Sequence, residues 1–301
     1  MRSRVSVLMA VGLAGVMAAP PAARAADIQI TPDPTAANVT AHGGSRNVVW
    51  SRVGSDGRSR LVQRIKSRNR DLPVRPKAGL FDPDIGTGAR GNQVIVYTRC
   101  AGLSGKNCDV WQYDGFDRKE QKVPGASSAR CSEFAPSVWI ATVAFARSGP
   151  AGCNGLYIAR RGKATKLDER VPAETDLRAH RVAYLHIPPN DSTRTFLRIR
   201  GARGGKSRVV VTGFAADGES YRVSNPFLDS KYVYWLQQDR IRNEFFAGRA
   251  NAIRSSVLEF TTRLFPGMVE SMAVARAGVF YTNGQGVYLA TDALGTFSAR
   301  G

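Results

Sequence analysis

The feature that most constrains the fold is a short strand-like motif, β-branched or small residues leading to an aromatic, that recurs six times. Successive aromatics are separated by 47, 48, 39, 51 and 46 residues. The six copies are Val48 to Trp50, Val96 to Tyr97, Val143 to Phe145, Val182 to Tyr184, Tyr232 to Trp235 and Val279 to Tyr281. A repeat of this length indicates a chain built from similar supersecondary units stacked on one another.

In most copies a turn and a second strand-like run follow the motif, so each repeat contains at least a hairpin. Apolar residues alternate with period two, and Gly and Pro interrupt the chain often, which leaves almost no helical periodicity. A period of roughly 40–50 residues with four strands per unit is typical of a propeller blade. We therefore predict an all-β fold, a six-bladed β-propeller with the aromatics packed between blades, and keep a β-sandwich as the alternative.

A ring of blades is locked when one end of the chain adds a strand to the blade formed by the other end. Two segments are placed to do this for the last repeat. They are Asp27 to Ile30 and the region from Asn38 to His42.

Some repeats also resemble a known family. Phe81 to Gly86 ahead of Val94 to Tyr97, and Pro136 to Trp139 ahead of Val143 to Phe145, are similar to degenerate copies of the P-x-W-S-P-D-G and I-A-F repeat of TolB-type propellers. The resemblance covers most of residues 40–292. It implies a six-bladed propeller that acts outside the cytoplasm through protein contacts, without catalysis. TolB carries an α/β domain before its propeller, whereas these repeats begin almost directly after the N-terminal segment.

That N-terminal segment, residues 1–25, has the features of a secretory signal: a basic start, an apolar stretch and an A-x-A cleavage site at Ala23 to Ala25. No later segment approaches the ~20 apolar residues of a membrane helix. We predict that residues 26–301 form one propeller domain, a secreted or periplasmic monomer.

The four cysteines are an even number, which in an oxidising compartment favours two disulfides. Three pairings are possible. We predict nearest-neighbour bridges, Cys100 with Cys108 and Cys131 with Cys153, because each pair flanks a turn or strand pair between neighbouring strand-like runs. A zinc site is disfavoured, since no C-x-x-C spacing and no adjacent histidine is present.

The chain is strongly basic, with 43 Lys and Arg against 24 Asp and Glu. Two stretches concentrate the charge: residues 58–77 hold eight basic side chains and one acid, and residues 198–208 hold five and none. As binding residues we select Arg58, Arg60, Arg64, Lys66, Arg68, Arg70, Arg198, Arg200, Arg203 and Lys206. Solvated loops and an Arg-rich coding bias are the alternatives.

An exported basic protein of this kind suits an anionic wall polymer or an acidic envelope protein. Nucleic acid is disfavoured because no nucleic-acid-binding motif is present. If basic loops gather on one face of the propeller, that face is the predicted binding surface.

Motifs for catalysis are weak. No G-x-S-x-G is present, and the three histidines, His42, His180 and His186, have no supporting motif. A hydrolase or lyase acting on polysaccharide would need paired carboxylates. Acidic residues near turns are Asp82, Asp84, Asp109, Asp114, Glu133 and Asp229, and no pair stands out. We predict no catalytic residue and no cofactor, and keep a propeller hydrolase or lyase with channel carboxylates as the alternative function.

Two further motifs are excluded by their context. Gly86, Gly88 and Gly91 spell G-x-G-x-x-G, but the run leads into a strand, whereas a dinucleotide site needs it after a strand and opening a helix. We predict a turn before a strand. Asp82 and Asp84 resemble the start of a calcium loop, but position twelve is Gln93 where the pattern needs Glu, so no metal site is predicted.

Overall fold

Strands make up nearly all of the regular structure. The computed structural model describes residues 27–42, 47–101, 107–216, 219–253, 258–261, 265–295 and 297–299. The single helical element within these residues is the 3-10 turn η1 (Ala293–Gly295). The predicted all-β class is confirmed, whereas the predicted signal peptide lies outside the described residues. No helix in the described part of the chain is long and apolar enough to cross a membrane.

The strands form four four-stranded antiparallel sheets and one nine-stranded sheet. The first sheet contains β2 (Ala36–Ala41), β3 (Val48–Val53), β4 (Ser59–Ile65) and β5 (Arg68–Asp71). The second contains β6 (Asp84–Thr87), β7 (Gln93–Cys100), β8 (Cys108–Asp114) and β9 (Lys119–Lys122). The third contains β10 (Ser132–Trp139), β11 (Thr142–Ser148), β12 (Gly155–Arg160) and β13 (Lys163–Asp168).

The nine-stranded sheet begins with β14 (Pro172–Arg178), β15 (Arg181–His186), β16 (Arg194–Gly201) and β17 (Gly204–Ala216). It continues through β18 (Glu219–Leu228), β19 (Tyr232–Asp239), β20 (Glu244–Asn251), β21 (Glu259–Thr261) and β25 (Phe297–Ala299). The last sheet contains β22 (Ser271–Ala275), β23 (Gly278–Thr282), β24 (Val287–Ala290) and β1 (Ile28–Thr31).

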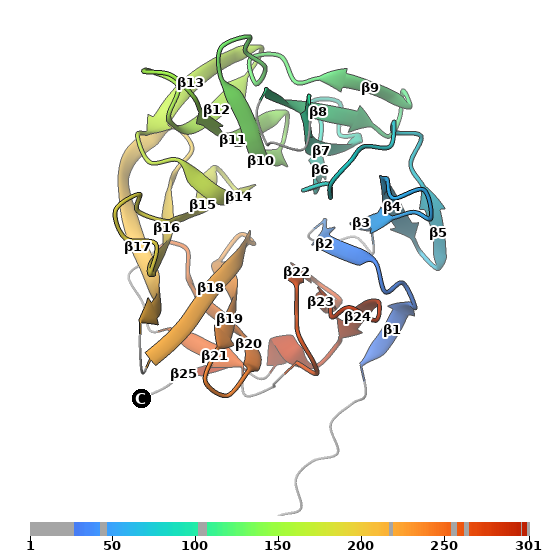
Figure 1. Ribbon diagram of the computed structural model, residues 1–301, viewed down its shortest axis with the longest axis vertical. Helices are drawn as coiled ribbons and strands as arrows, with labels where there is room; N and C mark the ends of the chain where they lie inside the picture. The colour runs from blue at the N-terminus through green and yellow to red at the C-terminus, as the bar shows by residue number, and fades with distance from the viewer. Residues whose placement is uncertain are drawn as a thin grey trace, which may run out of the picture.

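The strands surround a common centre, with β2, β6, β10, β14, β18 and β22 innermost (Figure 1). The six aromatic motifs found in the sequence lie on β3, β7, β11, β15, β19 and β23, each hydrogen-bonded to one of these inner strands. The runs that follow them form β4, β8, β12, β16, β20 and β24. The hairpin predicted in each repeat is therefore confirmed.

The first strand of the described chain joins the sheet formed by the last repeat. β1 pairs antiparallel with β24, with Ile28 opposite Leu289. This confirms the first of the two predicted closing segments. The second, the region around β2, instead begins the next sheet.

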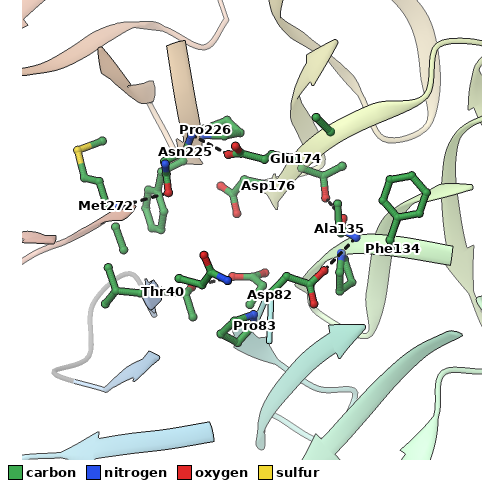
Figure 2. Close-up of a pocket in the computed structure, with 18 of the residues that line it drawn as sticks. Thr40, Asp82, Pro83, Phe134, Ala135, Glu174, Asp176, Asn225, Pro226 and Met272 are labelled. Atoms are coloured by element: carbon green, nitrogen blue, oxygen red, sulfur yellow. Dashed lines mark hydrogen bonds between the residues drawn. The ribbon is translucent and has the colours of Figure 1, made fainter. Parts of the chain in front are cut away.

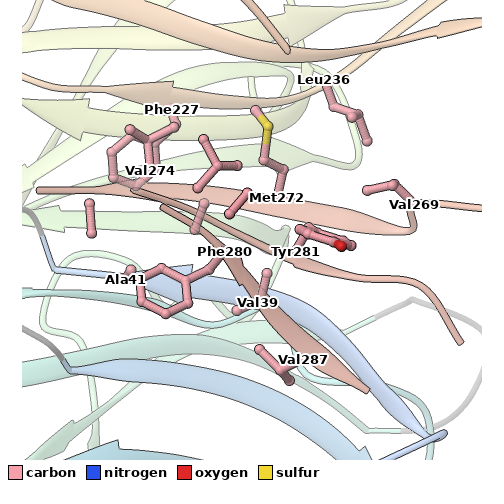
Figure 3. Packing of buried hydrophobic residues seen from close by; sticks show 14 of the residues in the cluster. Val39, Ala41, Phe227, Leu236, Val269, Met272, Val274, Phe280, Tyr281 and Val287 are labelled. Atoms are coloured by element: carbon pink, nitrogen blue, oxygen red, sulfur yellow. The ribbon is translucent and has the colours of Figure 1, made fainter. Parts of the chain in front are cut away.

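The repeated aromatics are the main packing units of the core. Trp50 is 1 % exposed, and Tyr97, Phe145, Tyr184, Trp235 and Tyr281 are 0 % exposed. Burying each of these side chains stabilises the fold by roughly 2–3 kcal/mol. The buried clusters join neighbouring sheets, as in Figure 3, where side chains from β18, β19 and β22–β24 pack with Val39 and Ala41 of β2. The prediction that the aromatics form core between sheets is confirmed.

The G-x-G-x-x-G run is part of a hairpin. Gly86 lies in β6, which pairs with β7 directly after the turn that holds Gly91. A Cβ on Gly86 would lie 2.2 Å from the carbonyl oxygen of Val138 in β10. This glycine therefore allows close approach of the next sheet, and the predicted turn before a strand is confirmed.

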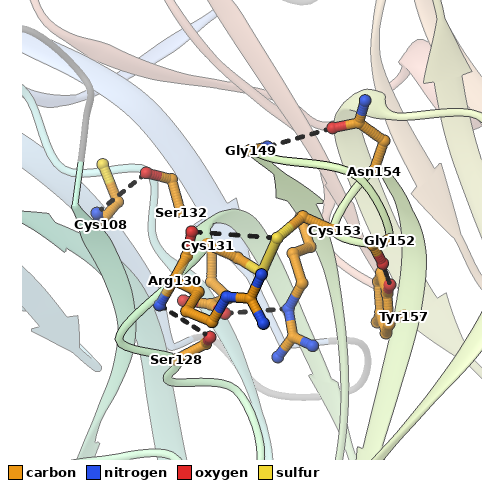
Figure 4. The surroundings of a disulfide bond; sticks show 12 residues. Cys108, Ser128, Arg130, Cys131, Ser132, Gly149, Gly152, Cys153, Asn154 and Tyr157 are labelled. Carbon is orange, nitrogen blue, oxygen red and sulfur yellow. Dashed lines mark hydrogen bonds and ion pairs between the residues drawn. A yellow bond between two sulfur atoms is a disulfide. The ribbon is translucent and has the colours of Figure 1, made fainter.

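Both predicted disulfides are present. Cys100 and Cys108 are opposite residues of β7 and β8, and Cys131, directly before β10, links to Cys153 in the turn between β11 and β12. Figure 4 shows the second bridge beside Arg130 and Asn154. No cysteine is free in the described residues. Two bridges are compatible with an oxidising compartment.

Replacing both members of the second bridge, Cys131→Ala with Cys153→Ala, should lower the free energy of unfolding by about 3 kcal/mol, because its closed loop has a sequence separation of 22. The shorter loop of Cys100 and Cys108, separation 8, should cost slightly less when opened. Urea unfolding of the two double variants measures both effects. Unchanged midpoints would contradict this account of the bridges.

Candidate functional site

Three of the inner strands are interrupted by a β-bulge. In β2, β10 and β18 the pairing register shifts, which marks a bulge. One residue in each bulge has a left-handed backbone: Asn38 with φ 53°, Ala135 with φ 48° and Asn225 with φ 52°. A bulge removes local N–H groups from the ladder, so these groups need other partners.

Side chains of the preceding inner segment supply those partners. Ser271 Oγ accepts the N–H of Val39 at 2.9 Å. Asp82 Oδ2 accepts the N–H of Ala135 at 3.2 Å, and Glu174 Oε2 accepts the N–H of Asn225 at 2.7 Å. Each bond joins two neighbouring inner segments of the ring, so these polar side chains hold the inner strands in register.

A second row of contacts follows deeper in the channel. Asp84 Oδ2 accepts the N–H of Val138 at 2.7 Å, and Asp176 accepts the N–H of Leu228. As the acceptor moves from Asp82 to Asp84, the donor moves from Ala135 to Val138, and the bonds of Glu174 and Asp176 follow the same order. Residue numbers therefore increase in the same direction on neighbouring inner strands. The inner strands therefore run in one direction. We call the side of the ring on which they begin face A.

A cavity of about 290 Å³ opens among the inner strands (Figure 2). It receives side chains from all six inner segments and contains five carboxyl groups and no Lys or Arg. The carboxyl groups belong to Asp82, Asp84, Glu174, Asp176 and Glu270. On a chain with such an excess of basic residues, this channel is a local acidic region.

Burial changes the ionisation of these carboxyl groups. It raises the pKa of Asp84 to about 6. Burial and then the charge of Asp84 raise the pKa of Asp176 to about 8. Burial also raises the pKa of Glu174. Both carboxyl groups therefore hold a proton more strongly than an exposed acid, and the charge of one affects the ionisation of the other, as in sites of acid–base chemistry.

The far side of the channel is different in character. His42 lies 3.4 Å from the carbonyl oxygen of Ile85 and 3.3 Å from Thr87 Oγ1. The Arg178 guanidinium lies 4.8 Å from the centroid of Trp139. Burial and the charge of Arg178 lower the pKa of His42, so this side carries an arginine and a neutral histidine. The described residues contain no cluster of three or more His, Cys, Asp and Glu side chains able to hold a metal ion.

Asp176→Asn should change how stability depends on pH. The pKa of Asp176 is raised from 3.8 to about 8 in the folded protein, so its stabilising contribution is complete below the unfolded value and is lost as pH rises through 8. Between pH 5 and pH 9 the wild-type protein should lose a few kcal/mol relative to the variant. Thermal unfolding of both proteins across this range measures the difference. Parallel curves would show that Asp176 ionises normally.

A second cavity, of about 490 Å³, lies between the first and second sheets. Its residues come from the turn before β4, the segment after β5, the end of β7, the start of β8 and the end of β9. We call it the Trp111 crevice; the side chains that matter are Arg58, Arg75, Lys77, Arg99, Asp109, Trp111 and Lys122. In an antiparallel run of four, the second strand ends beside the start of the first strand. The end of β7 therefore lies on face A, and this crevice opens there.

The Trp111 crevice contains five cations and one carboxylate. Two cations are paired: Arg99 with Glu120 at 2.6 Å and Lys122 with Asp109 at 2.7 Å. Within the described residues the other three, Arg58, Arg75 and Lys77, form no ion pair. The crevice is therefore a site with surplus positive charge.

An aromatic ring lies among these cations. Trp111 is half-buried, with Arg99 Cζ at 5.8 Å and Lys122 Nζ at 5.9 Å from its ring centroid. Burial lowers the pKa of Lys77, whose Nζ lies 4.9 Å from the centroid of Phe81. A bound anion would restore some of the charge stabilisation that burial removes.

The structure distributes the basic residues selected from the sequence over several places. Of the residues selected from the first stretch, Arg58 alone lines the Trp111 crevice, together with Arg75 and Lys77 of the same stretch, which were not selected. The others lie on the β4–β5 hairpin: Arg60 pairs with Asp56, Arg64 donates to the carbonyl of Ile30, Arg70 donates to Gln63, and Lys66 and Arg68 are exposed at the turn.

The second basic stretch lies on β16 and β17, on the opposite side of the ring from β4 and β5 in Figure 1. Arg198, Arg200 and Lys206 line a third cavity there. Arg203 lies in the β16–β17 turn. The third strand of each run ends on the side of the ring opposite to face A, so this turn lies on that opposite side.

The acidic candidates divide into two groups. Asp82 and Asp84 reach the channel. The other four stabilise local structure: Asp109 pairs with Lys122, Asp114 accepts the N–H of Phe116, Asp229 accepts the N–H groups of Lys231 and Tyr232, and the fully buried Glu133 pairs with Arg147 at 2.9 Å. His180 occupies the β14–β15 turn, and His186 lines the third cavity.

Sequence reasoning missed the channel residues Glu174, Asp176 and Glu270 and the crevice residues Arg99 and Trp111. One signal was available: Glu174-Thr-Asp176 repeats the spacing of Asp82-Pro-Asp84 ahead of an aromatic strand. No comparable signal marks Arg99 or Trp111, because their meeting depends on how neighbouring strands pair.

No family model matches the sequence, and no curated protein matches it. Solved structures do. A puromycin-hydrolysing peptidase of Mycobacterium tuberculosis superposes with a TM-score of 0.53 at 11% identity, over 82% of this chain and 48% of the peptidase, so this chain spans about half of that protein. An oligogalacturonate lyase of Vibrio parahaemolyticus gives 0.50 at 11%, over 86% and 79%.

The lectin SapL1, in complex with α-methyl fucoside, superposes with a TM-score of 0.53 at 10% identity, over 85% of this chain and 91% of the lectin. Identities this low establish the fold alone. Together with the sheet arrangement, they define the protein as all-β with the architecture of the β-propellers.

Proposed function

We propose that the protein is a secreted or periplasmic six-bladed propeller of the TolB type that binds an anionic polysaccharide through face A, without catalysis. Two features support the blade number. The nine-stranded sheet divides into two runs of four, β14–β17 and β18–β21, and six inner strands surround one channel. The disulfides support the compartment, since such bridges persist where the surroundings are oxidising.

The observation that carries the proposed ligand is the Trp111 crevice. Its unpaired Arg58, Arg75 and Lys77 give it surplus positive charge, and Trp111 offers an aromatic surface. A charged sugar unit matches both features, because its carboxylate pairs with guanidinium groups and its C–H face packs on an indole ring.

A volume of about 490 Å³ is also of the size that holds one or two sugar units, whereas an acidic protein partner would need a broad flat surface. The crevice thus favours the anionic polymer over an acidic envelope protein. Oligogalacturonate, named for the lyase that shares this fold, is a suitable probe because every unit carries a carboxylate.

Arg58→Gln with Arg75→Gln should weaken binding of trigalacturonate about tenfold at 0.1 M salt, since each lost contact contributes roughly 0.7 kcal/mol. The matched control is Lys66→Gln with Arg68→Gln, which removes the same charge from the exposed β4–β5 turn of the same sheet. Isothermal titration calorimetry at several salt concentrations measures both. The control should change affinity less than twofold. Equal weakening by the two variants would mean that binding follows net charge and not the crevice.

A second candidate function is hydrolysis or elimination on a polysaccharide in the channel, and the spread pKa values of Asp84 and Asp176 favour it. A protonated Asp176 would donate a proton to the leaving group while the ionised Asp84 acts as base or nucleophile. Against this reading, both carboxyl groups already accept N–H groups of the next sheet.

The two functions separate in one assay. Polygalacturonate is incubated with wild-type protein, Asp84→Asn and Asp176→Asn, and new reducing ends and unsaturated products are measured. The binding function predicts no product from any of the three proteins. Product from the wild type that falls at least a hundredfold in either variant would establish the enzyme instead.

A further inference from the structure

A third cavity, of about 840 Å³, lies between the end of β13 and the strands β15, β16 and β17. We call it the Arg198 crevice. Its charged and titratable side chains are Asp168, Glu169, Arg170, His186, Arg198, Arg200 and Lys206, of which Glu169 pairs with Lys166 outside the cavity at 2.8 Å. They come from two neighbouring runs of four strands, β10–β13 and β14–β17, so the cavity is a crevice between sheets.

The charges of the Arg198 crevice do not cancel. Asp168 pairs with Arg170 at 2.9 Å and with Arg200 at 3.0 Å, and it also accepts the Tyr184 hydroxyl. Arg198 donates to the Ser207 hydroxyl at 3.2 Å and forms no ion pair within the described residues. Lys206 likewise has no carboxylate partner there. Two positive charges are therefore available to a ligand.

Unused hydrogen-bonding groups gather at the same place. Within the described residues, six buried side-chain nitrogen and oxygen atoms lack a hydrogen-bond partner. Three of them belong to this crevice: His186 Nδ1, Arg198 Nε and Arg200 Nε. The other three belong to the Glu133–Arg147 ion pair. Buried polar groups are normally paired, so this concentration indicates a site that a ligand completes.

We infer that the Arg198 crevice is a second anion-binding site, which takes one carboxylate, sulfate or phosphate group of a polymer. Guanidinium groups bind such oxyanions in a planar, two-point arrangement, and a partly desolvated crevice strengthens each contact. Arg198 and Lys206 would hold the anion, while Asp168 fixes the position of Arg200 beside it.

The position of this crevice suggests how the protein uses it. The Trp111 and Arg198 crevices are made from corresponding parts: the end of a second strand, the third and fourth strands of the same run, and the end of the preceding sheet. Both therefore lie at boundaries between neighbouring runs of the ring, with the runs β6–β9 and β10–β13 between them. One long anionic chain that occupies both would bind more tightly than a short chain in either. This bridging rests on the proposed function, whereas the second anion site does not.

The test uses the whole protein and trigalacturonate, too short to be assumed to span both sites, in isothermal titration calorimetry. The expected stoichiometry is two per protein. Arg198→Gln with Lys206→Gln should remove one site and leave the other unchanged. Lys163→Gln with Arg203→Gln is the matched control, because it removes the same charge from exposed positions of the same two runs that do not line the crevice. The control should keep both sites.

Long polygalacturonate then tests bridging. Its affinity should exceed that of trigalacturonate at least a hundredfold, and the Arg198 crevice variant should lose that gain while the control keeps it. A stoichiometry of one that the Arg198 crevice variant does not alter would overturn the second site. Two sites without a gain for the long polymer would overturn bridging. Loss of trigalacturonate binding only in the Arg198 crevice variant would retain this inference and reject the Trp111 crevice.

Discussion

The arrangement of the inner strands depends on polar side chains that accept backbone N–H groups of the next inner strand. Bulges at Asn38, Ala135 and Asn225 free backbone N–H groups, and Ser271, Asp82 and Glu174 accept them. Leaving one of these buried N–H groups unpaired would cost about 1–3 kcal/mol of folding free energy. Each bond therefore fixes the position of one inner strand relative to its neighbour. The aromatic core fills the space between the sheets, whereas these directional bonds set their register.

These hydrogen bonds also distinguish the central channel from the crevices between the sheets. Asp82, Asp84, Glu174 and Asp176 of the channel accept backbone N–H groups, and these bonds stabilise the arrangement of the inner strands. Farther from the axis, strands of neighbouring sheets diverge and leave crevices whose cations are not needed for register. Arg58, Arg75 and Lys206 form no ion pair within the described residues, and we therefore propose that they bind the ligand.

Much of the fold could be predicted from the sequence, because the aromatic spacing and the cysteine positions are local patterns. The site could not be predicted in the same way. Residues 58–77 look like one basic patch, yet Arg60 is paired with Asp56, and Arg64 and Arg70 donate to Ile30 and Gln63. The Trp111 crevice needs Arg99 and Lys122, which are separated along the chain and meet only when β7, β8 and β9 pair.

The central claim is that two corresponding crevices of one propeller ring bind an anionic polymer. Hydrogen–deuterium exchange of the whole protein, with and without saturating polygalacturonate, tests it most directly. The account predicts slower exchange in peptides covering residues 75–78 and 107–111 of one crevice and residues 167–171 and 204–207 of the other, with the β4–β5 turn unchanged. Protection confined to the exposed β4–β5 turn, or spread evenly over every basic segment, would contradict it.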